Sequence, residues 1–156
     1  MSECLSCLDL TKRFGAKEAL RSVNFKLEKG RIVGLLGPNG SGKTTLLKLV
    51  SGLLQPTDGS VLIEGMPPGI ETKRKVSYLP DQMYLGDWMR VRDIIEYFQD
   101  FYEDFDGDRA RAMLETLGIR PSQKIRAMSK GTREKVQLIL VMSRRASLYC
   151  LDEPIA

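Results

Sequence analysis

Residues 37–44, Gly-Pro-Asn-Gly-Ser-Gly-Lys-Thr, follow the P-loop pattern, in which four residues separate a glycine from a Gly-Lys-Thr triplet. An apolar run at residues 32–36 precedes the motif and a second run at residues 45–50 follows it. The pattern therefore predicts a strand, a loop and a helix in that order. A chance glycine-rich turn would lack these flanks. The glycines let the backbone close around an anion, so we expect an α/β fold that holds a triphosphate.

Lys43 is predicted to place its charge on the β- and γ-phosphates, and the Thr44 hydroxyl is predicted to bind Mg²⁺. The predicted nucleotide contacts come from the loop and from the first turn of the helix: Gly37, Pro38, Asn39, Gly40, Ser41, Gly42, Lys43, Thr44 and Thr45.

The composition is that of a soluble globular protein, with 42% hydrophobic and 28% charged residues in a chain of 156 residues. The net charge of +4 comes from short basic groups, of which the longest is residues 73–75. This indicates a solvated surface, and no nucleic-acid partner is expected. Apolar runs are too short to span a membrane and the N-terminus does not resemble a signal peptide, so a cytoplasmic protein is expected. With three cysteines and no histidine, neither a disulfide framework nor a zinc site is expected.

The sequence of the first half of the chain predicts mainly strands. We predict strands at residues 5–10, 23–27, 60–64 and 76–79, and a turn at residues 56–59. The helix after the P-loop is predicted to end between Val50 and Gly52.

The sequence of the second half of the chain predicts mainly helices. A helix is predicted at residues 91–105, with Ile94, Tyr97, Phe98 and Phe101 on one buried face. A second helix is predicted at residues 108–117. A third helix starts at Ser129 as its N-cap and buries Val136, Ile139 and Leu140, before a last strand at residues 147–151.

Two aromatics in a predicted loop and two acids stand out in this half. Tyr84 and Trp88 precede the first helix, where core packing and contact with a partner are both possible interpretations.

The last strand ends in Asp152 and Glu153. An Asp at the end of a strand beside a P-loop helps to hold Mg²⁺, and the adjacent Glu153 is predicted to orient the attacking water.

Three motifs in order, the P-loop, Ser129-x-Gly131 and the strand ending in Asp152-Glu153-Pro154, resemble the ATPase subunit of ABC transporters. The likeness is greatest to bacterial exporter ATPases that pair with a separate membrane subunit. It implies a P-loop NTPase core with an N-terminal antiparallel β subdomain and a helical subdomain inserted before the signature motif. The implied division is residues 1–83, 84–128 and 129–156.

The resemblance also assigns site residues. Ser129 and Gly131 match the signature motif that binds the γ-phosphate of ATP held by a second copy, although Met128, Lys130 and Thr132 depart from its usual Leu-Ser-Gly-Gly-Gln. Phe14 matches the aromatic that stacks on adenine.

The resemblance implies a loop residue after the strand at 76–79 that contacts Mg²⁺ and the attacking water. The aligned residue is Asp81, where most relatives have Gln, and Gln82 follows it, so either residue fits this role.

The implied function is an ATP-binding and ATP-hydrolysing subunit, with ATP and Mg²⁺ as cofactors. It would lie on the inner face of the membrane as a dimer and contact a membrane-spanning subunit through the Tyr84–Trp88 region. Family elements that normally follow residue 154 are not matched, so we expect the C-terminal part to be missing and turnover to be negligible. The alternatives are a nucleotide-binding module with little or no turnover and a soluble ABC-type ATPase that acts outside transport.

Overall fold

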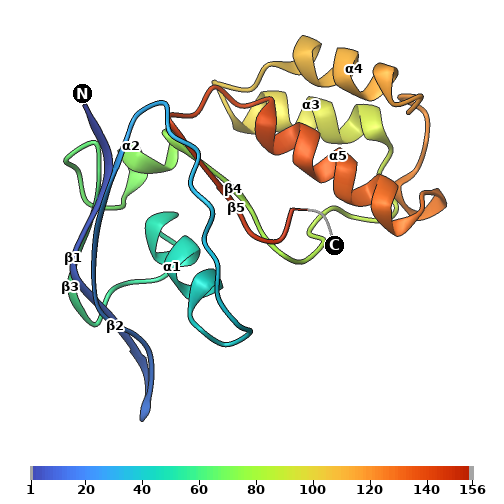
Figure 1. Ribbon diagram of the computed structural model, residues 1–156. Helices are drawn as coiled ribbons and strands as arrows, with labels where there is room; N and C mark the ends of the chain where they lie inside the picture. Colours follow the sequence, from blue (N-terminus) through green and yellow to red (C-terminus); the bar gives the residue numbers. More distant parts are fainter. Residues whose placement is uncertain (1, 155–156) are drawn as a thin grey trace. The chain divides into compact units, whose positions relative to one another are not determined.

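The structure is a computed structural model that describes residues 2–154. The chain forms two compact units, Met1–Val76 and Ser77–Ala156, shown in Figure 1. The α/β fold with an N-terminal antiparallel sheet and a helical part is confirmed. The subdivision at residues 83 and 128 stays a prediction. Within the described residues, no helix combines the length and apolar character needed to cross a membrane.

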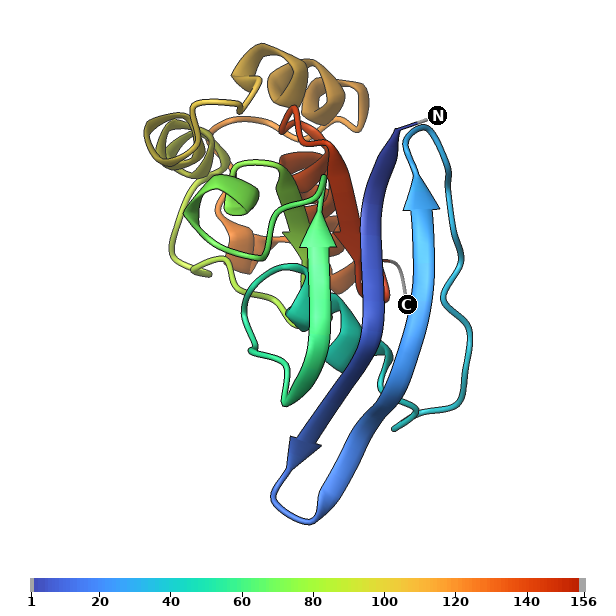
Figure 2. The ribbon, with the colours of Figure 1, turned by 90° about the vertical axis from the view of Figure 1, so that its left-hand side faces the viewer.

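The first unit is built on a three-stranded antiparallel sheet, seen in Figure 2, with the order β2-β1-β3. Its strands are β1 (Glu3–Phe14), β2 (Lys17–Glu28) and β3 (Asp58–Ile63). The three predicted strands are confirmed, although β1 and β2 are longer than predicted. Residues 4–7 of the central strand β1 are all buried, and this strand is paired on both edges.

Helix α1 (Lys43–Val50) follows the P-loop and buries Leu46, Leu49 and Val50. Its predicted end is confirmed, since the backbone turns at Gly52 with φ of 70°. The turn predicted at residues 56–59 is wrong in part, because β3 already begins at Asp58. Gly59 makes this possible: a Cβ there would lie 2.2 Å from the Asp9 carbonyl oxygen, so only glycine lets β3 approach β1 this closely.

The strand predicted at residues 32–36 is wrong. This segment has no regular secondary structure, and Ile32 and Leu36 are 102% and 93% exposed. None of the strands in the described part of the chain pairs with it. An apolar run indicates a buried strand, but a strand also needs a neighbour for its backbone hydrogen bonds, and that neighbour is a tertiary feature.

The second unit joins a short sheet to three helices. Strands β4 (Val76–Leu79) and β5 (Leu148–Leu151) form the sheet, and the Asp152 amide donates to the Leu79 carbonyl oxygen at 2.9 Å. The carboxyl ends of both strands therefore lie side by side. The helices are α3 (Val91–Phe101), α4 (Gly107–Thr116) and α5 (Lys130–Met142), with a 3₁₀ turn, η1 (Ile125–Ala127), before α5. A short helix α2 (Ile70–Lys73), not predicted, precedes β4.

The three helices enclose one hydrophobic core. Its buried members are Val91, Ile94, Ile95, Phe98, Phe105, Ala110, Leu114, Ile119, Ile125, Met128, Val136, Ile139 and Leu140. The buried face predicted for α5 is therefore confirmed. The buried face predicted for α3 is partly wrong, because Tyr97 and Phe101 are 51% and 67% exposed. The helix is also shorter than predicted, since it ends at Phe101. Ile94 and Phe98 are buried as predicted, and Val91 and Ile95 join them in the core, because the neighbouring helices set which stripe is covered.

A buried ion pair ties the α3–α4 connection to the residues after α5. The Arg144 guanidinium, 5% exposed, lies 3.1 Å from the Asp104 carboxylate and stacks over the Tyr102 ring at 4.2 Å. The Arg145 amide also donates to the Asp104 carbonyl oxygen at 2.9 Å. The connection is therefore fixed by charge as well as by packing.

In the first unit, the Glu64 carboxylate lies 2.5 Å from the ammonium groups of both Lys29 and Lys75. These hydrogen bonds lower the pKa of Glu64 from 4.5 to about 2. A carboxyl whose pKa is lowered on folding stabilises the fold above its unfolded pKa, and this stabilisation is lost as the pH falls toward the folded pKa.

We therefore expect wild type to lose more stability than Glu64→Gln between pH 5 and pH 2, measured by thermal melting under circular dichroism. Solvent screens the partly exposed lysines, so the difference should be about 1 kcal/mol. Glu71→Gln is the control, because Glu71 has no ion pair among residues 2–154. Equal pH profiles for wild type and Glu64→Gln would contradict the role of the pair.

Candidate nucleotide and metal site

The P-loop is a tight turn held against β2. The Ser41 amide donates to the Pro38 carbonyl oxygen at 3.2 Å, and the backbone of Gly42 has φ of 96°. A Cβ at Gly42 would lie 2.5 Å from the Ala19 carbonyl oxygen and 2.7 Å from the Leu20 side chain. Glycine is therefore required at position 42 both for its backbone conformation and for the contact with β2.

The Lys43 side chain folds back over this turn. Its ammonium group donates to the carbonyl oxygens of Gly37 at 2.7 Å and Pro38 at 2.9 Å. This places one positive charge at the loop, beside the first turn of α1. Since the two acceptors are neutral carbonyls, phosphate oxygens would compete for the same ammonium protons with full negative charge.

The N-terminus of α1 is suited to an anion. Within the described chain, no side chain caps this end and its first turn holds no acidic residue. Thr44 and Thr45 occupy this first turn and are partly exposed. The first amides of a helix have no intrahelical acceptor and carry the positive end of the helix dipole. All predicted P-loop residues are thus gathered in one exposed segment of the first unit.

Phe14 lies at the end of β1 in the same unit. Its ring is 48% exposed, and the Lys12 ammonium lies 5.1 Å from the ring centre while donating to the Gln55 carbonyl oxygen at 2.8 Å. Lys12 pairs in register with Leu20, the residue that meets Gly42. Lys12 is therefore the position of β1 that lies opposite the P-loop contact, and Phe14 follows it two residues later. One face of the Phe14 ring is open to solvent. The contact with Lys12 was missed by sequence reasoning.

In the second unit, Asp152 follows β5 and is 4% exposed. Its Oδ2 is buried and has no hydrogen-bond partner among the described residues. A buried carboxylate oxygen without a partner is costly, and a hard cation such as Mg²⁺ prefers this kind of ligand. Asp152 therefore fits a role in holding Mg²⁺.

Tyr78, on β4, was not predicted as a site residue. Burial, with the nearby charges of Asp152 and Asp81, raises the pKa of Tyr78 to about 12. Its hydroxyl therefore keeps its proton at neutral pH near these two carboxylates. A tyrosine in an apolar strand is expected to be a core residue, so nothing in the sequence indicates that Tyr78 lies beside the two carboxylates.

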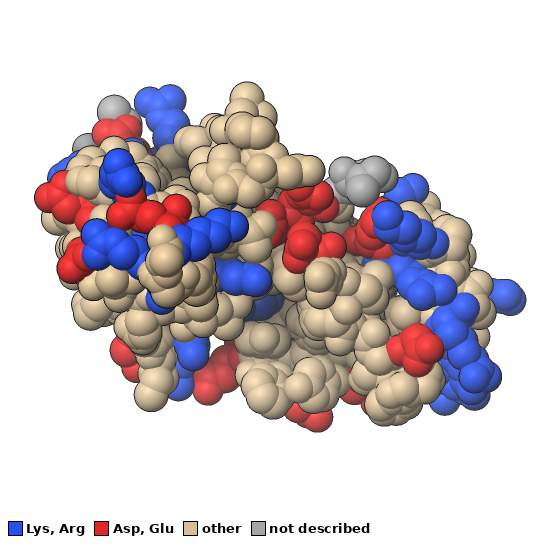
Figure 3. Space-filling model, turned by 90° about the horizontal axis from the view of Figure 1, so that it is seen from below, with Lys and Arg blue, Asp and Glu red and all other residues tan. Residues whose placement is uncertain are grey.

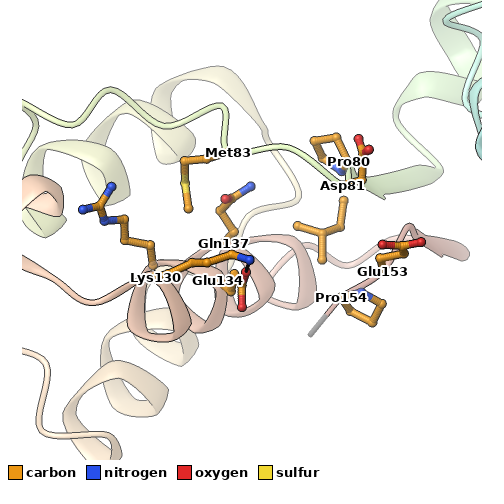
Figure 4. A pocket seen from close by; sticks show the side chains of 10 residues that line it. Pro80, Asp81, Met83, Lys130, Glu134, Gln137, Glu153 and Pro154 are labelled. Atoms are coloured by element: carbon orange, nitrogen blue, oxygen red, sulfur yellow. Dashed lines mark ion pairs between the residues drawn. The ribbon is translucent and has the colours of Figure 1, made fainter. Parts of the chain in front are cut away.

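A hollow of about 260 Å³ opens where the carboxyl ends of β4 and β5 meet α5. Its lining comes from both strand ends and from one side of the helix: Leu79, Pro80, Asp81, Met83, Lys130, Arg133, Glu134, Gln137, Glu153 and Pro154. Figure 4 shows Asp81 and Glu153 toward one end and Lys130 toward the other. The structure thus brings Asp81 and Glu153 to one hollow. Gln82 is exposed and does not line it.

Glu153 combines exposure with an unusual backbone. Its φ is 45°, a left-handed conformation that is uncommon for residues other than glycine. Such strain is found most often at functional sites, where the surrounding structure holds it in place. The turn lets the chain leave β5 sharply, so that Asp152 is buried while Glu153 faces the hollow.

Ser129 is the N-cap of α5, as predicted, and its hydroxyl accepts from the Thr132 amide at 3.2 Å. Gly131 is exposed, and a Cβ added there would meet no atom within 4 Å. The fold itself therefore does not require glycine at position 131. The Lys130 side chain is 82% exposed, and its ammonium group lies 3.6 Å from the Glu134 carboxylate. Glu134 therefore partly neutralises the charge of Lys130 within α5.

Comparison with known proteins agrees with these features. Residues 20–156 match the family described as ABC transporter. The chain is 34% identical over 152 residues to the SkfA peptide export ATP-binding protein SkfE of Bacillus subtilis, covering 94% of this chain and 64% of that protein. It is 31% identical over 147 residues to the ABC transporter ATP-binding protein YtrB of Bacillus subtilis, covering 93% and 50%.

Solved structures give the same picture. A putative ABC transporter ATP-binding protein from Pyrococcus furiosus superposes with a TM-score of 0.85 at 30% identity, covering 97% of this chain and 76% of that one. The chain spans between half and two thirds of the length of these two Bacillus relatives.

Proposed function

The chain belongs to the ABC transporter family, and we propose on this basis that it is an ATP-binding and ATP-hydrolysing subunit that energises a separate membrane-spanning subunit. The observation that carries the proposal is the P-loop with Lys43 folded over it. An ammonium group and a helix N-terminus at one tight turn suit the phosphates of a nucleotide.

For ATP, we propose that the loop amides and Lys43 hold the β- and γ-phosphates. The exposed ring of Phe14 offers a surface on which the adenine stacks. Transfer of the γ-phosphoryl group depends mainly on positioning and charge stabilisation, so these contacts would supply most of the catalysis in this half of the site.

For Mg²⁺, we propose the Thr44 hydroxyl and the Asp152 carboxylate as ligands. Support comes from the buried Oδ2 of Asp152, which has no partner within the described chain. When bound, Mg²⁺ would neutralise charge on the β- and γ-phosphates. Glu153 is proposed to orient the attacking water, and Asp81 or Gln82 to assist it. Asp81 is favoured because it lines the same hollow as Glu153.

We further propose that two copies share two ATP molecules, with Ser129 and Gly131 of one copy contacting the γ-phosphate held by the other. The open space at Gly131 supports an external ligand, because nothing within the fold requires a glycine there. The proposed location is the cytoplasmic face of the membrane, beside the membrane-spanning subunit. The relative SkfE is named for peptide export.

The test separates the two neighbouring acids. Asp152→Asn should weaken ATP binding about tenfold in the presence of Mg²⁺, while leaving binding in EDTA unchanged, because a metal ligand is lost. Glu153→Gln should keep wild-type affinity, since a residue that orients water does not hold the nucleotide. Isothermal titration calorimetry with ATP, with and without Mg²⁺, measures both. Equal effects of the two changes would contradict the assignment.

A further inference from the structure

Two buried side-chain oxygens at the neighbouring strands β4 and β5 have no hydrogen-bond partner among residues 2–154. One is the hydroxyl of Tyr78 on β4, and the other is Oδ2 of Asp152, directly after β5. A buried polar group without a partner costs free energy, so nearly all such groups in native proteins have one. Tyr78 can donate and Asp152 can accept, so the two groups suit one shared hydrogen-bond network.

The side chain of Tyr78 points away from α5. Successive side chains of a strand alternate between the two faces of its sheet. The Ser77 hydroxyl donates to the Val141 carbonyl oxygen of α5 at 2.9 Å, and Leu79 lines the hollow beside α5. Ser77 and Leu79 therefore face α5, and Tyr78, which lies between them, faces the opposite side of the sheet.

Asp152 lies close to Tyr78. The Asp152 amide donates to the Leu79 carbonyl oxygen at 2.9 Å, which sets Asp152 beside the end of β4. Glu153 lines the hollow beside α5, whereas the buried Asp152 does not. Burial raises the pKa of Tyr78, and so do the charges of Asp152 and Asp81, which means that both carboxylates are near its hydroxyl. Tyr78 and Asp152 therefore meet at the carboxyl ends of the two strands, outside the hollow.

The charges around this pair favour a cation. Asp81 and Glu153 are exposed acids at the same strand ends. Figure 3 shows Asp and Glu side chains close together on the face of the molecule seen from below. A divalent cation at Asp152 would be attracted by these carboxylates. A neutral hydroxyl that donates to Asp152 supports the carboxylate without adding a charge that would repel the cation.

We propose that Tyr78 is a positioning residue for the Mg²⁺ site, and that its hydroxyl donates to the Asp152 carboxylate, directly or through one water. This inference rests on the proposed role of Asp152 as a ligand of Mg²⁺. A carboxylate has about four lone-pair sites, so it can bind a cation and accept a hydrogen bond at the same time. Hydrogen bonds to a ligating carboxylate fix its orientation and raise its affinity for the metal. Tyr78 thus holds Asp152 in the orientation that meets the cation.

Tyr78→Phe removes only the hydroxyl and keeps the ring. Isothermal titration calorimetry with ATP gives the Mg²⁺ advantage, which is the ratio of the dissociation constants in EDTA and in Mg²⁺. In Tyr78→Phe this advantage should fall about fivefold, the usual effect of one hydrogen bond, while affinity in EDTA equals that of wild type. In the Asp152→Asn background, Tyr78→Phe should cause no further loss, because residues that act through one another are not additive. The melting temperature without ligand should not fall, since the hydroxyl has no partner within residues 2–154.

Tyr149→Phe is the matched control, because it makes the same change on β5, where the hydroxyl already donates to the Arg144 carbonyl oxygen and accepts from the Ala146 amide. Its Mg²⁺ advantage should stay within about twofold of wild type, since separate sites act independently. The role of Tyr78 is overturned by an unchanged Mg²⁺ advantage in Tyr78→Phe, by equal losses in EDTA and in Mg²⁺, or by a further loss in the Asp152→Asn background. An unchanged advantage in Asp152→Asn would instead refute the proposed metal ligand, and the role of Tyr78 with it.

Discussion

Replacement of Lys43 by alanine is expected to abolish the rise in melting temperature that ATP and Mg²⁺ give the wild-type chain. A ligand present at about 100 times its dissociation constant stabilises the native state by about 2.7 kcal/mol. For a chain of this size, that corresponds to a shift of about 5–10 °C. The Lys43 ammonium is the charge that lies directly at the loop, 2.7 Å from the Gly37 carbonyl oxygen. Without it, the loop amides alone face the phosphates.

Lys48→Ala is the control for this experiment, since it removes a lysine from the last turn of the same helix. It alters net charge and helix composition in the same way, but at the end of α1 away from the loop. Its nucleotide-dependent shift should equal that of wild type. A normal shift in Lys43→Ala would refute the assignment of the P-loop, and equal losses in both variants would point to a general charge effect.

Arg144→Met is expected to cause the largest loss of stability, about 2–4 kcal/mol, because it leaves the Asp104 carboxylate without its buried partner. Arg144 is 5% exposed, whereas the Asp104 side chain is 24% exposed, so some water can replace the lost contact. The stacking of Arg144 on Tyr102 is lost as well. Methionine fills part of the volume, so the loss reports mainly on charge and hydrogen bonding.

Arg145→Met is the matched control, because the adjacent Arg145 is 76% exposed and pairs with Asp106 at the surface. Exposed pairs of this kind contribute little. Urea denaturation followed through Trp88, which lies in the same unit, measures both variants. Arg144→Lys should recover part of the stability, because a lysine restores the charge without the two-atom contact. Similar losses for Arg144→Met and Arg145→Met would show that burial of the pair is not what stabilises this connection.

The success and failure of the sequence-based predictions follow from the range of the interactions involved. Strand β4 and the ends of α1 and α5 depend on nearby residues: Pro80, Gly52 and the Ser129 cap. The segment at residues 32–36 and the exposed Tyr97 and Phe101 depend on which neighbours are present and where they pack. An apolar pattern records that a residue suits burial, but it does not record which partner covers it.

By itself, the sequence determined the chemistry available to this protein: the P-loop, the acid pair at residues 152–153 and the Ser-x-Gly helix start are local patterns in which spacing alone sets the geometry. Tertiary structure decided the rest. It buried Asp152 while turning Glu153 outward, placed Asp81 on the same hollow, and left Trp88 exposed. Burial, charge pairing and close approach each depend on residues distant in sequence, so they arise only when the chain is folded.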